Sequence, residues 1–308
     1  MPAKITVIGA GNVGSTSVNR LTEKQLGDVV LLDRARGVTK GKVLDLMQTH
    51  PIDGFDAKIV ATSDYRETGD SDIIVVTAGQ PRKPGMSRDD LLSRNADVVR
   101  SVVEQAVQKS PDAIIIMVTN PLDAMTYIAK KVSSFSRNKV IGMAGALDSA
   151  RLREFIAMEL TASVWDVQAM VLGGHGDLMV PLVQYCTVAG IPITELMSKG
   201  QVDKIIERTR KAGGEIVGYL ETGSAFWAPA SAITQMVESI VKDTYRIIPC
   251  SVYLEGEYGL SDICIGVPVK LGANGVEEVI EIRLDSEDMA GLRKSADAVR
   301  ASLDRLGL

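Results

Sequence analysis

Lys4-Ile-Thr-Val-Ile-Gly-Ala-Gly-Asn-Val-Gly14 is the stretch of this 308-residue chain that decides the fold. Its apolar part, residues 5–8, is typical of a buried strand, and the segment that follows has helical character to about Gln25. Between the two, closely spaced glycines would let backbone N–H groups and the positive end of a helix dipole meet a pyrophosphate. The residues of this loop are Gly9, Ala10, Gly11, Asn12, Val13 and Gly14. A turn of this kind can also be purely structural, so the residues around it decide.

A second apolar stretch, residues 28–32, ends at Asp33. A dinucleotide-binding unit carries an acidic residue at this point, where it accepts hydrogen bonds from the ribose hydroxyls of the adenosine. The carboxylate of Asp33 would repel a 2′-phosphate, so the pattern favours NAD over NADP as the cofactor. The glycine loop and Asp33 together predict a bound dinucleotide.

Four further strands are expected in the first half of the chain, near residues 58–61, 73–76, 114–118 and 140–142. Six strands separated by helices or loops indicate a parallel, doubly wound sheet that binds ligands at the carboxyl ends of its strands. The expected fold class is α/β: a Rossmann doubly wound parallel sheet followed by an α+β substrate domain. We expect an NAD-binding domain in residues 1–145 and a catalytic, substrate-binding domain in residues 146–308, because the pattern changes after Gly145.

The second half mixes helical and β-rich stretches. Helices are expected over about 147–160, 201–221, 229–242 and 286–305, and β-rich stretches over 251–255 and 262–282. The last helix carries one apolar stripe, which we interpret as core packing.

Charge and composition exclude several classes of protein. The formal net charge is −5 at pH 7 and no block of like charges occurs, which argues against nucleic acid or an anionic membrane as the main partner. The three cysteines, Cys186, Cys250 and Cys264, are an odd number without metal-like spacing, so we expect reduced thiols in a cytoplasmic protein and no metal site. The longest apolar runs are too short to cross a bilayer, and the first strand begins too early to leave room for a signal peptide.

A loop with several cations follows the fourth strand: Thr77-Ala-Gly-Gln-Pro-Arg-Lys-Pro-Gly-Met-Ser-Arg88. Its glycines and prolines suit hinge-like motion, and it carries Arg82, Lys83 and Arg88 without an acidic residue. Such a lid could bring cations over an anionic substrate, although a solvated basic loop is the alternative. The fifth strand ends in Val118-Thr-Asn-Pro121, where Asn120 could orient a carbonyl or hydroxyl group or simply form a turn.

Candidate reacting groups come from the second half. Val171-Leu-Gly-Gly-His-Gly-Asp-Leu-Met-Val-Pro181 presents His175, one of two histidines, between glycines that leave room for a ligand. Its charge near neutral pH depends on its neighbours, so it is a candidate for moving a proton; a structural histidine is the alternative. Asp148 and Arg151 lie three residues apart near a helix start and project from one face. Arg151 could bind a carboxylate and Asp148 an imidazole N–H, or the two could form only a local ion pair.

Five motifs, in this order, resemble those of the lactate/malate dehydrogenase family: Ile8-Gly-Ala-Gly-Asn-Val-Gly14, Arg82-Lys-Pro-Gly-Met-Ser-Arg88, Val118-Thr-Asn-Pro121, Leu147-Asp-Ser-Ala-Arg151 and Gly173-Gly-His-Gly-Asp177. The resemblance covers essentially the whole chain. It implies an NAD-dependent enzyme in which His175 donates a proton to the substrate carbonyl oxygen and Asp148 orients and charges His175. Arg151 would clamp the substrate's C1 carboxylate, and Arg88 would polarise the carbonyl group.

The resemblance also implies that Asn95, Val118 and Asn120 contact the cofactor, Asn120 the substrate as well, and that the chain forms a homodimer or homotetramer. It implies a substrate choice at Arg82, a position that is usually Gln in the lactate enzymes of the family and Arg in the malate enzymes. A guanidinium there would pair with the second carboxylate of oxaloacetate and stay unpaired with pyruvate. A small dicarboxylate, malate or oxaloacetate, is therefore the expected substrate. Pyruvate and L-lactate are the alternative, and a dinucleotide-binding protein without turnover is a third interpretation.

Overall fold

A computed structural model describes residues 2–80 and 88–308, and of residues 88 and 89 only the backbone. Within these residues a nine-stranded sheet runs through the molecule in the order β14-β13-β12-β6-β5-β4-β1-β2-β3. Its strands are β1 (Lys4–Ile8), β2 (Asp28–Leu32), β3 (Ile59–Thr62), β4 (Ile73–Val76), β5 (Ile114–Met117), β6 (Val140–Gly142), β12 (Arg246–Glu255), β13 (Ser261–Gly272) and β14 (Gly275–Val279).

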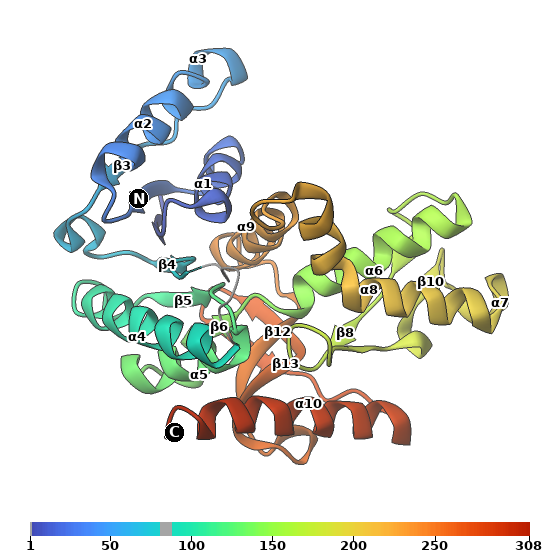
Figure 1. Ribbon diagram of the computed structural model, residues 1–308. Coiled ribbons are helices and arrows are strands. Elements are labelled where there is room, and N and C mark those ends of the chain that lie inside the picture. Colours follow the sequence, from blue (N-terminus) through green and yellow to red (C-terminus); the bar gives the residue numbers. More distant parts are fainter. Residues whose placement is uncertain (1, 81–87) are drawn as a thin grey trace.

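The part of this sheet from β1 to β6 is entirely parallel. Strand β1 lies between β2 and β4, with Ile5 opposite both Val29 and Ile73, so the strand order reverses at β1 and β4. The strands are connected by α1 (Asn12–Glu23), α2 (Arg36–Met47), α3 (His50–Asp53), η1 (Tyr65–Thr68), α4 (Arg88–Val107), α5 (Leu122–Ser133) and η2 (Arg137–Lys139). Figure 1 shows α4 and α5 side by side next to β5. The expected α/β class with a doubly wound parallel sheet is confirmed.

The central strands are apolar along their whole length. Strand β4 reads Ile-Ile-Val-Val and β5 reads Ile-Ile-Ile-Met, and every residue of both is buried. Parallel strands covered on both faces need such continuous apolar runs, because neither face meets water.

The second half of the chain extends the same sheet with antiparallel strands. Ser251 of β12 pairs opposite Gly142 of β6, and β13 and β14 follow antiparallel. Strand β12 begins at Arg246, earlier than the expected start at residue 251, because residues 246–250 pair with β13 although Ile247 is exposed. The two halves therefore share one sheet and one large apolar core.

The rest of the second half forms a smaller core beside the sheet, around α6 and α8. Its helices are α6 (Gly145–Leu160), η3 (Val183–Tyr185), α7 (Ile193–Leu196) and α8 (Lys199–Leu220). Its short strands are β7 (Val167–Gln168), β8 (Val171–Leu172), β9 (Val180–Pro181), β10 (Thr187–Val188) and β11 (Ile191–Pro192). Helices α9 (Trp227–Val241) and α10 (Ser286–Asp304) pack on the large sheet, and η4 (Glu257–Gly259) connects β12 to β13. Helix α9 packs against α1 of the first half, and α10 lies across β13 (Figure 1).

Candidate active site

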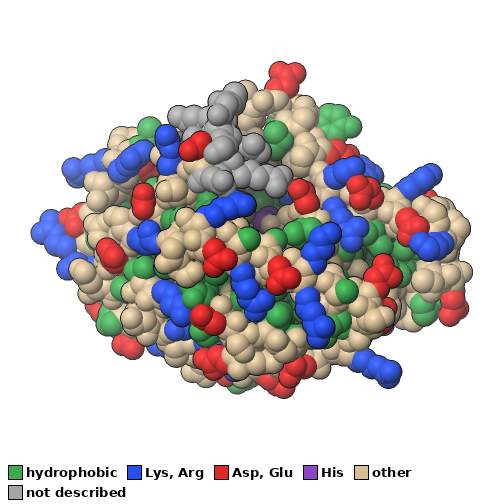
Figure 2. Space-filling view, turned by 60° about the horizontal axis from the view of Figure 1, so that its bottom comes forward, with side chains coloured by type: hydrophobic (Ala, Val, Ile, Leu, Met, Phe, Trp, Pro, Cys, Tyr) green, Lys and Arg blue, Asp and Glu red, His purple; other side chains and the backbone are tan. Residues whose placement is uncertain are grey.

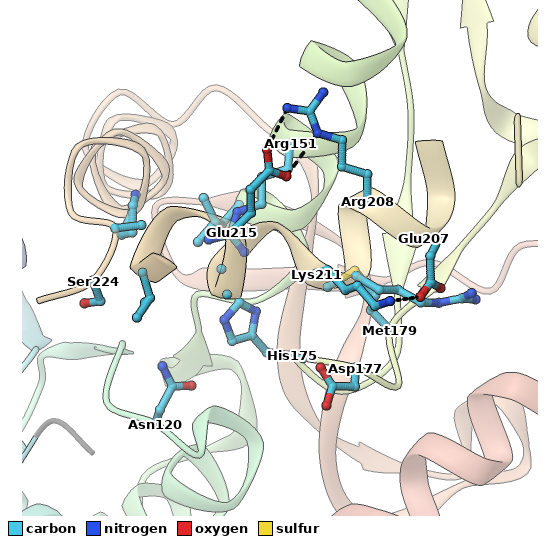
Figure 3. Close-up of a pocket in the computed structure, with 18 of the residues that line it drawn as sticks. Asn120, Arg151, His175, Asp177, Met179, Glu207, Arg208, Lys211, Glu215 and Ser224 are labelled. Atoms are coloured by element: carbon cyan, nitrogen blue, oxygen red, sulfur yellow. Dashed lines mark hydrogen bonds and ion pairs between the residues drawn. The ribbon is translucent and has the colours of Figure 1, made fainter. Parts of the chain in front are cut away.

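A cavity of about 1160 Å³ opens where the carboxyl edge of the parallel strands meets the second half of the chain. Val13 and Val118 line it from the first half, and Arg151 and His175 line it from the second. Figure 2 shows a hollow in this face of the molecule with a histidine side chain inside it and Lys and Arg side chains nearby. In Figure 3, Asn120, Arg151 and His175 surround the same space. The structure thus places residues of the dinucleotide-binding pattern in the first half and candidate reacting groups of the second half around one cavity.

His175 and Asp148 form a hydrogen-bonded pair. The His175 Nδ1–H donates to Asp148 Oδ2 over 2.8 Å, and the Asp148 side chain is 2% exposed. Asp148 lies in the first turn of α6, and His175 lies in the loop between β8 and β9. Because Nδ1 is occupied, Nε2 is the ring nitrogen left for a ligand.

The charge of Asp148 makes His175 a stronger base. Burial acts to lower the pKa of His175, but the negative charge of Asp148 and its hydrogen bond more than offset this effect. The charge of Arg151 acts to lower the same pKa and that of Asp123 to raise it, and the net result is a raised pKa. The ring of His175 therefore keeps its proton to a higher pH than the ring of an ordinary histidine does.

Arg151 is held by the same carboxylate. Its Nη1 lies 3.2 Å from Asp148 Oδ1, and its side chain is 13% exposed. The Nε–H is buried and has no hydrogen-bond partner among the described residues. A buried donor without a partner is costly, so this edge of the guanidinium is suited to meet the oxygens of a carboxylate ligand in the cavity.

The glycine loop is shaped for close backbone approach. Gly9 has a φ of 111°, which favours glycine, and a side chain on Gly14 would overlap the carbonyl oxygen of Gly9. A side chain on Gly11 would meet no atom of the described residues within 4 Å. Helix α1 has no side-chain cap at Gly11 and no acidic residue in its first turn, as far as the described residues show. Its first N–H groups are thus suited to bind an anion.

Asp33 is fixed by the loop that it faces. Its Oδ2 accepts from the Ala10 N–H over 2.8 Å, and its Oδ1 accepts from the Ala35 N–H over 2.8 Å. Lys42 of α2 donates to the Ala10 carbonyl oxygen over 2.7 Å. Sequence reasoning missed Lys42, because no spacing relates a mid-helix lysine to a loop so far back in the chain.

The remaining predicted residues divide into three groups. Val118 and Asn120 line the cavity. Asn95 is buried, and its amide accepts from the Gln80 N–H over 2.8 Å and donates to the Asn120 carbonyl oxygen over 2.7 Å, so it connects two loops of the site. Arg82 lies outside the described residues, as does the side chain of Arg88, the first residue of α4.

In residues 2–80 and 88–308, no helix is both long enough and apolar enough to pass through a membrane. The same part of the chain holds no group of three or more His, Cys, Asp or Glu residues placed to bind a metal ion. Cys186, Cys250 and Cys264 are buried free thiols.

The loop geometry predicts opposite outcomes for two glycine substitutions. Gly14→Ala should lower the free energy of unfolding by about 2 kcal/mol, because the new methyl group overlaps backbone. Gly11 has an ordinary φ of −68° and open space around the position of a Cβ, so Gly11→Ala should change the free energy of unfolding by less than about 0.5 kcal/mol. The same methyl group would occupy space that a pyrophosphate needs, so we expect Gly11→Ala to bind NADH about tenfold more weakly. Denaturant unfolding and NADH fluorescence titration measure the two effects, and unchanged NADH affinity of Gly11→Ala would place the pyrophosphate elsewhere.

Comparison with protein families divides the chain into two matched regions. Residues 3–142 match the family model described as lactate/malate dehydrogenase, NAD binding domain. Residues 145–306 match the model described as lactate/malate dehydrogenase, alpha/beta C-terminal domain.

Similar proteins match over nearly their full length. Malate dehydrogenase of Roseiflexus castenholzii is 59% identical over 306 residues, which cover 99% of this chain and 99% of that protein. The structure of malate dehydrogenase from Salinibacter ruber has a TM-score of 0.95 and 51% identity, and the match covers 99% of this chain and 97% of that one. The lactate dehydrogenase of Cryptosporidium parvum, complexed with lactic acid and nicotinamide adenine dinucleotide, has a TM-score of 0.94 and 39% identity, with 98% and 97% covered.

Proposed function

The chain belongs to the lactate/malate dehydrogenase family, and from this premise we propose that it is an NAD-dependent malate dehydrogenase that interconverts L-malate and oxaloacetate. The observation that carries the proposal is one buried carboxylate, Asp148, that binds both His175 and Arg151. His175 and Arg151 border the cavity that Val13 of the glycine loop also lines, and Asp148 lies buried behind them. A proton donor and a carboxylate-binding fork beside a nucleotide loop suit the reduction of a 2-oxo acid.

The residues of the first half fit NAD. The uncapped start of α1 and the open face of Gly11 would hold the pyrophosphate, and Asp33 would bind the adenosine ribose. Asn120 and Val118 would border the nicotinamide, with Asn95 holding Asn120 in place. When bound, NAD supplies or accepts the hydride. We assign residues 1–145 to this NAD-binding domain and residues 146–308 to the catalytic domain.

The second half supplies the proton and the substrate clamp. In the direction of reduction, His175 Nε2 would give its proton to the carbonyl oxygen of oxaloacetate as that oxygen gains charge. Asp148 keeps the proton of Nδ1 in place and stabilises the imidazolium. Arg151 would bind the C1 carboxylate, and Arg88 would polarise the carbonyl group. In the reverse direction, neutral His175 would take the proton from the hydroxyl group of malate.

We propose that Arg82 binds the second carboxylate of the substrate, and its replacement tests the substrate assignment. We expect Arg82→Gln to lower kcat/KM for oxaloacetate about a hundredfold, because the second carboxylate loses its partner, and to raise kcat/KM for pyruvate. The measurement is the kcat/KM ratio of the two substrates in the unmodified protein and in the variant. A preference of the unmodified protein for pyruvate would overturn the malate assignment in favour of lactate. Unchanged selectivity in the variant would leave the assignment intact but would show that Arg82 does not determine the choice between the two substrates.

The raised pKa of His175 predicts opposite pH dependences for the two directions. Reduction of oxaloacetate needs the protonated ring, so its kcat/KM should hold to a pH above the ordinary pKa of about 6.5 and then decline. Oxidation of malate needs the neutral ring, so its rate should rise over the same interval. Asp148→Asn removes the charge that raises the pKa and should move both transitions to lower pH. Profiles that stay in place in this variant would mean that another group titrates.

We further propose that the protein is a cytoplasmic homodimer or homotetramer whose partner is a small dicarboxylate rather than nucleic acid or a membrane. The net charge of −5 without blocks of like charge supports the absence of nucleic-acid binding. Light scattering of the purified protein would give the subunit number.

A further inference from the structure

A second buried carboxylate lies next to the His175 loop, on α5. Asp123, in the first turn of α5, is 5% exposed. Its Oδ2 accepts from the His175 backbone N–H over 2.9 Å, and its Oδ1 accepts from the Ser251 hydroxyl over 2.7 Å. No motif of the sequence pointed to Asp123, and the reaction proposed above does not use it.

Asp123 belongs to a set of anchors that fix three successive residues of the loop. Gly173 exchanges two backbone hydrogen bonds with Gly266 of β13, over 2.8 and 3.2 Å. The Gly174 N–H donates to Ser295 Oγ of α10 over 2.6 Å. The His175 N–H donates to Asp123. Two of the three anchors are neutral, so an acceptor without charge is enough to hold this backbone, and the third anchor is a carboxylate in a buried position where charge is costly.

The hydrogen bonds around Asp123 favour its charged form. The net pKa of Asp123 is raised, chiefly by burial and also by the charge of Asp148, while the Ser251 hydroxyl, the His175 N–H and the charge of His175 oppose this rise. The His175 N–H can only donate, so Oδ2 must accept. A carboxylate that accepts two hydrogen bonds beside an imidazolium is the state in which all of these groups are satisfied.

Other charges near His175 largely cancel. Among the described residues, the charged side chains that border the two cavities around His175 are Arg151 of α6, Asp123 of α5, Asp177 of its own loop, the ion pairs Glu207–Lys211 and Arg208–Glu215 of α8, with Asp203, Lys204 and Arg210 on the same helix, and Arg305 after α10. Asp148 is already partly neutralised by Arg151. The charge on Asp123 is therefore an independent contribution to the field at the ring.

We propose that Asp123 is a positioning residue of the active site: its carboxylate fixes the backbone of His175 and its negative charge, added to that of Asp148, keeps the imidazole protonated between turnovers. The inference rests on the proton-donor role proposed for His175, and it deepens that role by giving the imidazolium two carboxylate neighbours on different elements.

The two histidines of the chain make a direct test available without cofactor or substrate. Imidazole NMR titration of the full-length protein gives one midpoint for His175 and one for His50, which lies in α3 against the ring of Phe55 and serves as an internal reference. His50→Gln assigns the two signals. Asp123→Asn keeps an acceptor for the His175 N–H and removes the charge, so we expect the His175 midpoint to fall by about half a pH unit or more. The His50 midpoint should stay in place.

Ser295→Ala is the matched control, because it releases the adjacent N–H of Gly174 without changing any charge. We expect its His175 midpoint to remain at the unmodified value even if kcat falls. Ser251→Ala removes a donor that stabilises the charged form of Asp123, so it should lower the midpoint in the same direction and by less. If Asp123→Asn does not fold, this variant decides: a folded Ser251→Ala protein with an unmoved midpoint overturns the proposal.

Two results overturn the proposal outright: an unmoved His175 midpoint in Asp123→Asn, or an equal shift in Ser295→Ala, which would reduce Asp123 to a structural anchor. The titration reads the ring itself and does not depend on which 2-oxo acid the protein reduces. In kinetics, the same charge effect should move the alkaline limb of kcat/KM for oxaloacetate to lower pH in Asp123→Asn but not in Ser295→Ala.

Discussion

Replacing His175 with asparagine is expected to lower kcat for oxaloacetate reduction about ten-thousandfold. Asparagine is close to histidine in reach and can still donate an amide N–H to Asp148 Oδ2, the atom that holds the ring at 2.8 Å. It has no proton that it can give up near neutral pH, so the oxygen of the reduced carbonyl would have to take its proton from water. Stopped-flow or steady-state loss of NADH absorbance with saturating oxaloacetate measures the effect.

NADH affinity in His175→Asn should stay within about twofold of the unmodified protein, because the glycine loop lies between β1 and α1 and Asp33 follows β2, on other segments than His175. Fluorescence titration of NADH is the control. Turnover that persists in this variant would remove His175 from the mechanism. An unmodified protein that binds NADH but reduces no 2-oxo acid would instead favour a dinucleotide-binding protein without catalysis.

The parts of the site that sequence could predict are those whose geometry is local. The glycine loop joins two consecutive elements, and the clash that a side chain on Gly14 would cause is with Gly9, five positions earlier in the same motif. Asp33 ends the next strand, and its contact with Ala10 follows from the parallel pairing of β1 and β2. The burial of β4 and β5 likewise follows from their uninterrupted apolar residues.

The partnership of Asp148 with His175 required more than spacing. Asp148 and Arg151 share a helix face by their three-residue separation, which left open a local ion pair, or a carboxylate site at Arg151 with Asp148 binding an imidazole N–H. His175 lies 27 positions from Asp148, so spacing could not decide between these alternatives, and the resemblance to a known family favoured the second. The structure contains both the ion pair with Arg151 and the hydrogen bond with His175, because one oxygen of Asp148 binds the guanidinium and the other binds the ring.

Contacts between distant elements could not be predicted. Asp123 meets Ser251 across 128 positions of chain, because β12 pairs with β6 and so extends the sheet beyond the first half. The antiparallel strand β12 has no pattern that says which strand it joins, since a strand's alternation reports burial and not its neighbour. Lys42 reaches Ala10 in the same non-local way.

Arg151→Lys is expected to lower kcat/KM for oxaloacetate about a thousandfold, although the positive charge is kept. A lysine ammonium is a point charge that can still pair with Asp148, but it cannot place two parallel N–H groups on one carboxylate. The buried Nε–H of Arg151, which has no partner within the described residues, is the donor that lysine cannot replace. A substrate held by one contact instead of two is also misoriented for proton transfer from His175, so kcat should fall together with a rise in KM.

Arg153→Lys provides a matched control on the same helix. Arg153 donates to the carbonyl oxygens of Val167 and Val164, over 2.8 and 3.1 Å, so its fork holds backbone rather than the cavity. This variant should keep kcat/KM within about threefold and lose at most about 1 kcal/mol of stability.

Arg151→Gln removes both the planar fork and the charge, whereas Arg151→Lys removes only the fork. Because the charge of Arg151 acts to lower the pKa of His175, the alkaline limb of the pH profile for reduction should move to higher pH in Arg151→Gln. Arg151→Lys should leave that limb in place. A lysine variant with full kcat/KM would mean that the C1 carboxylate binds a point charge, and an unmoved limb in Arg151→Gln would mean that the guanidinium lies too far from the ring to influence its proton.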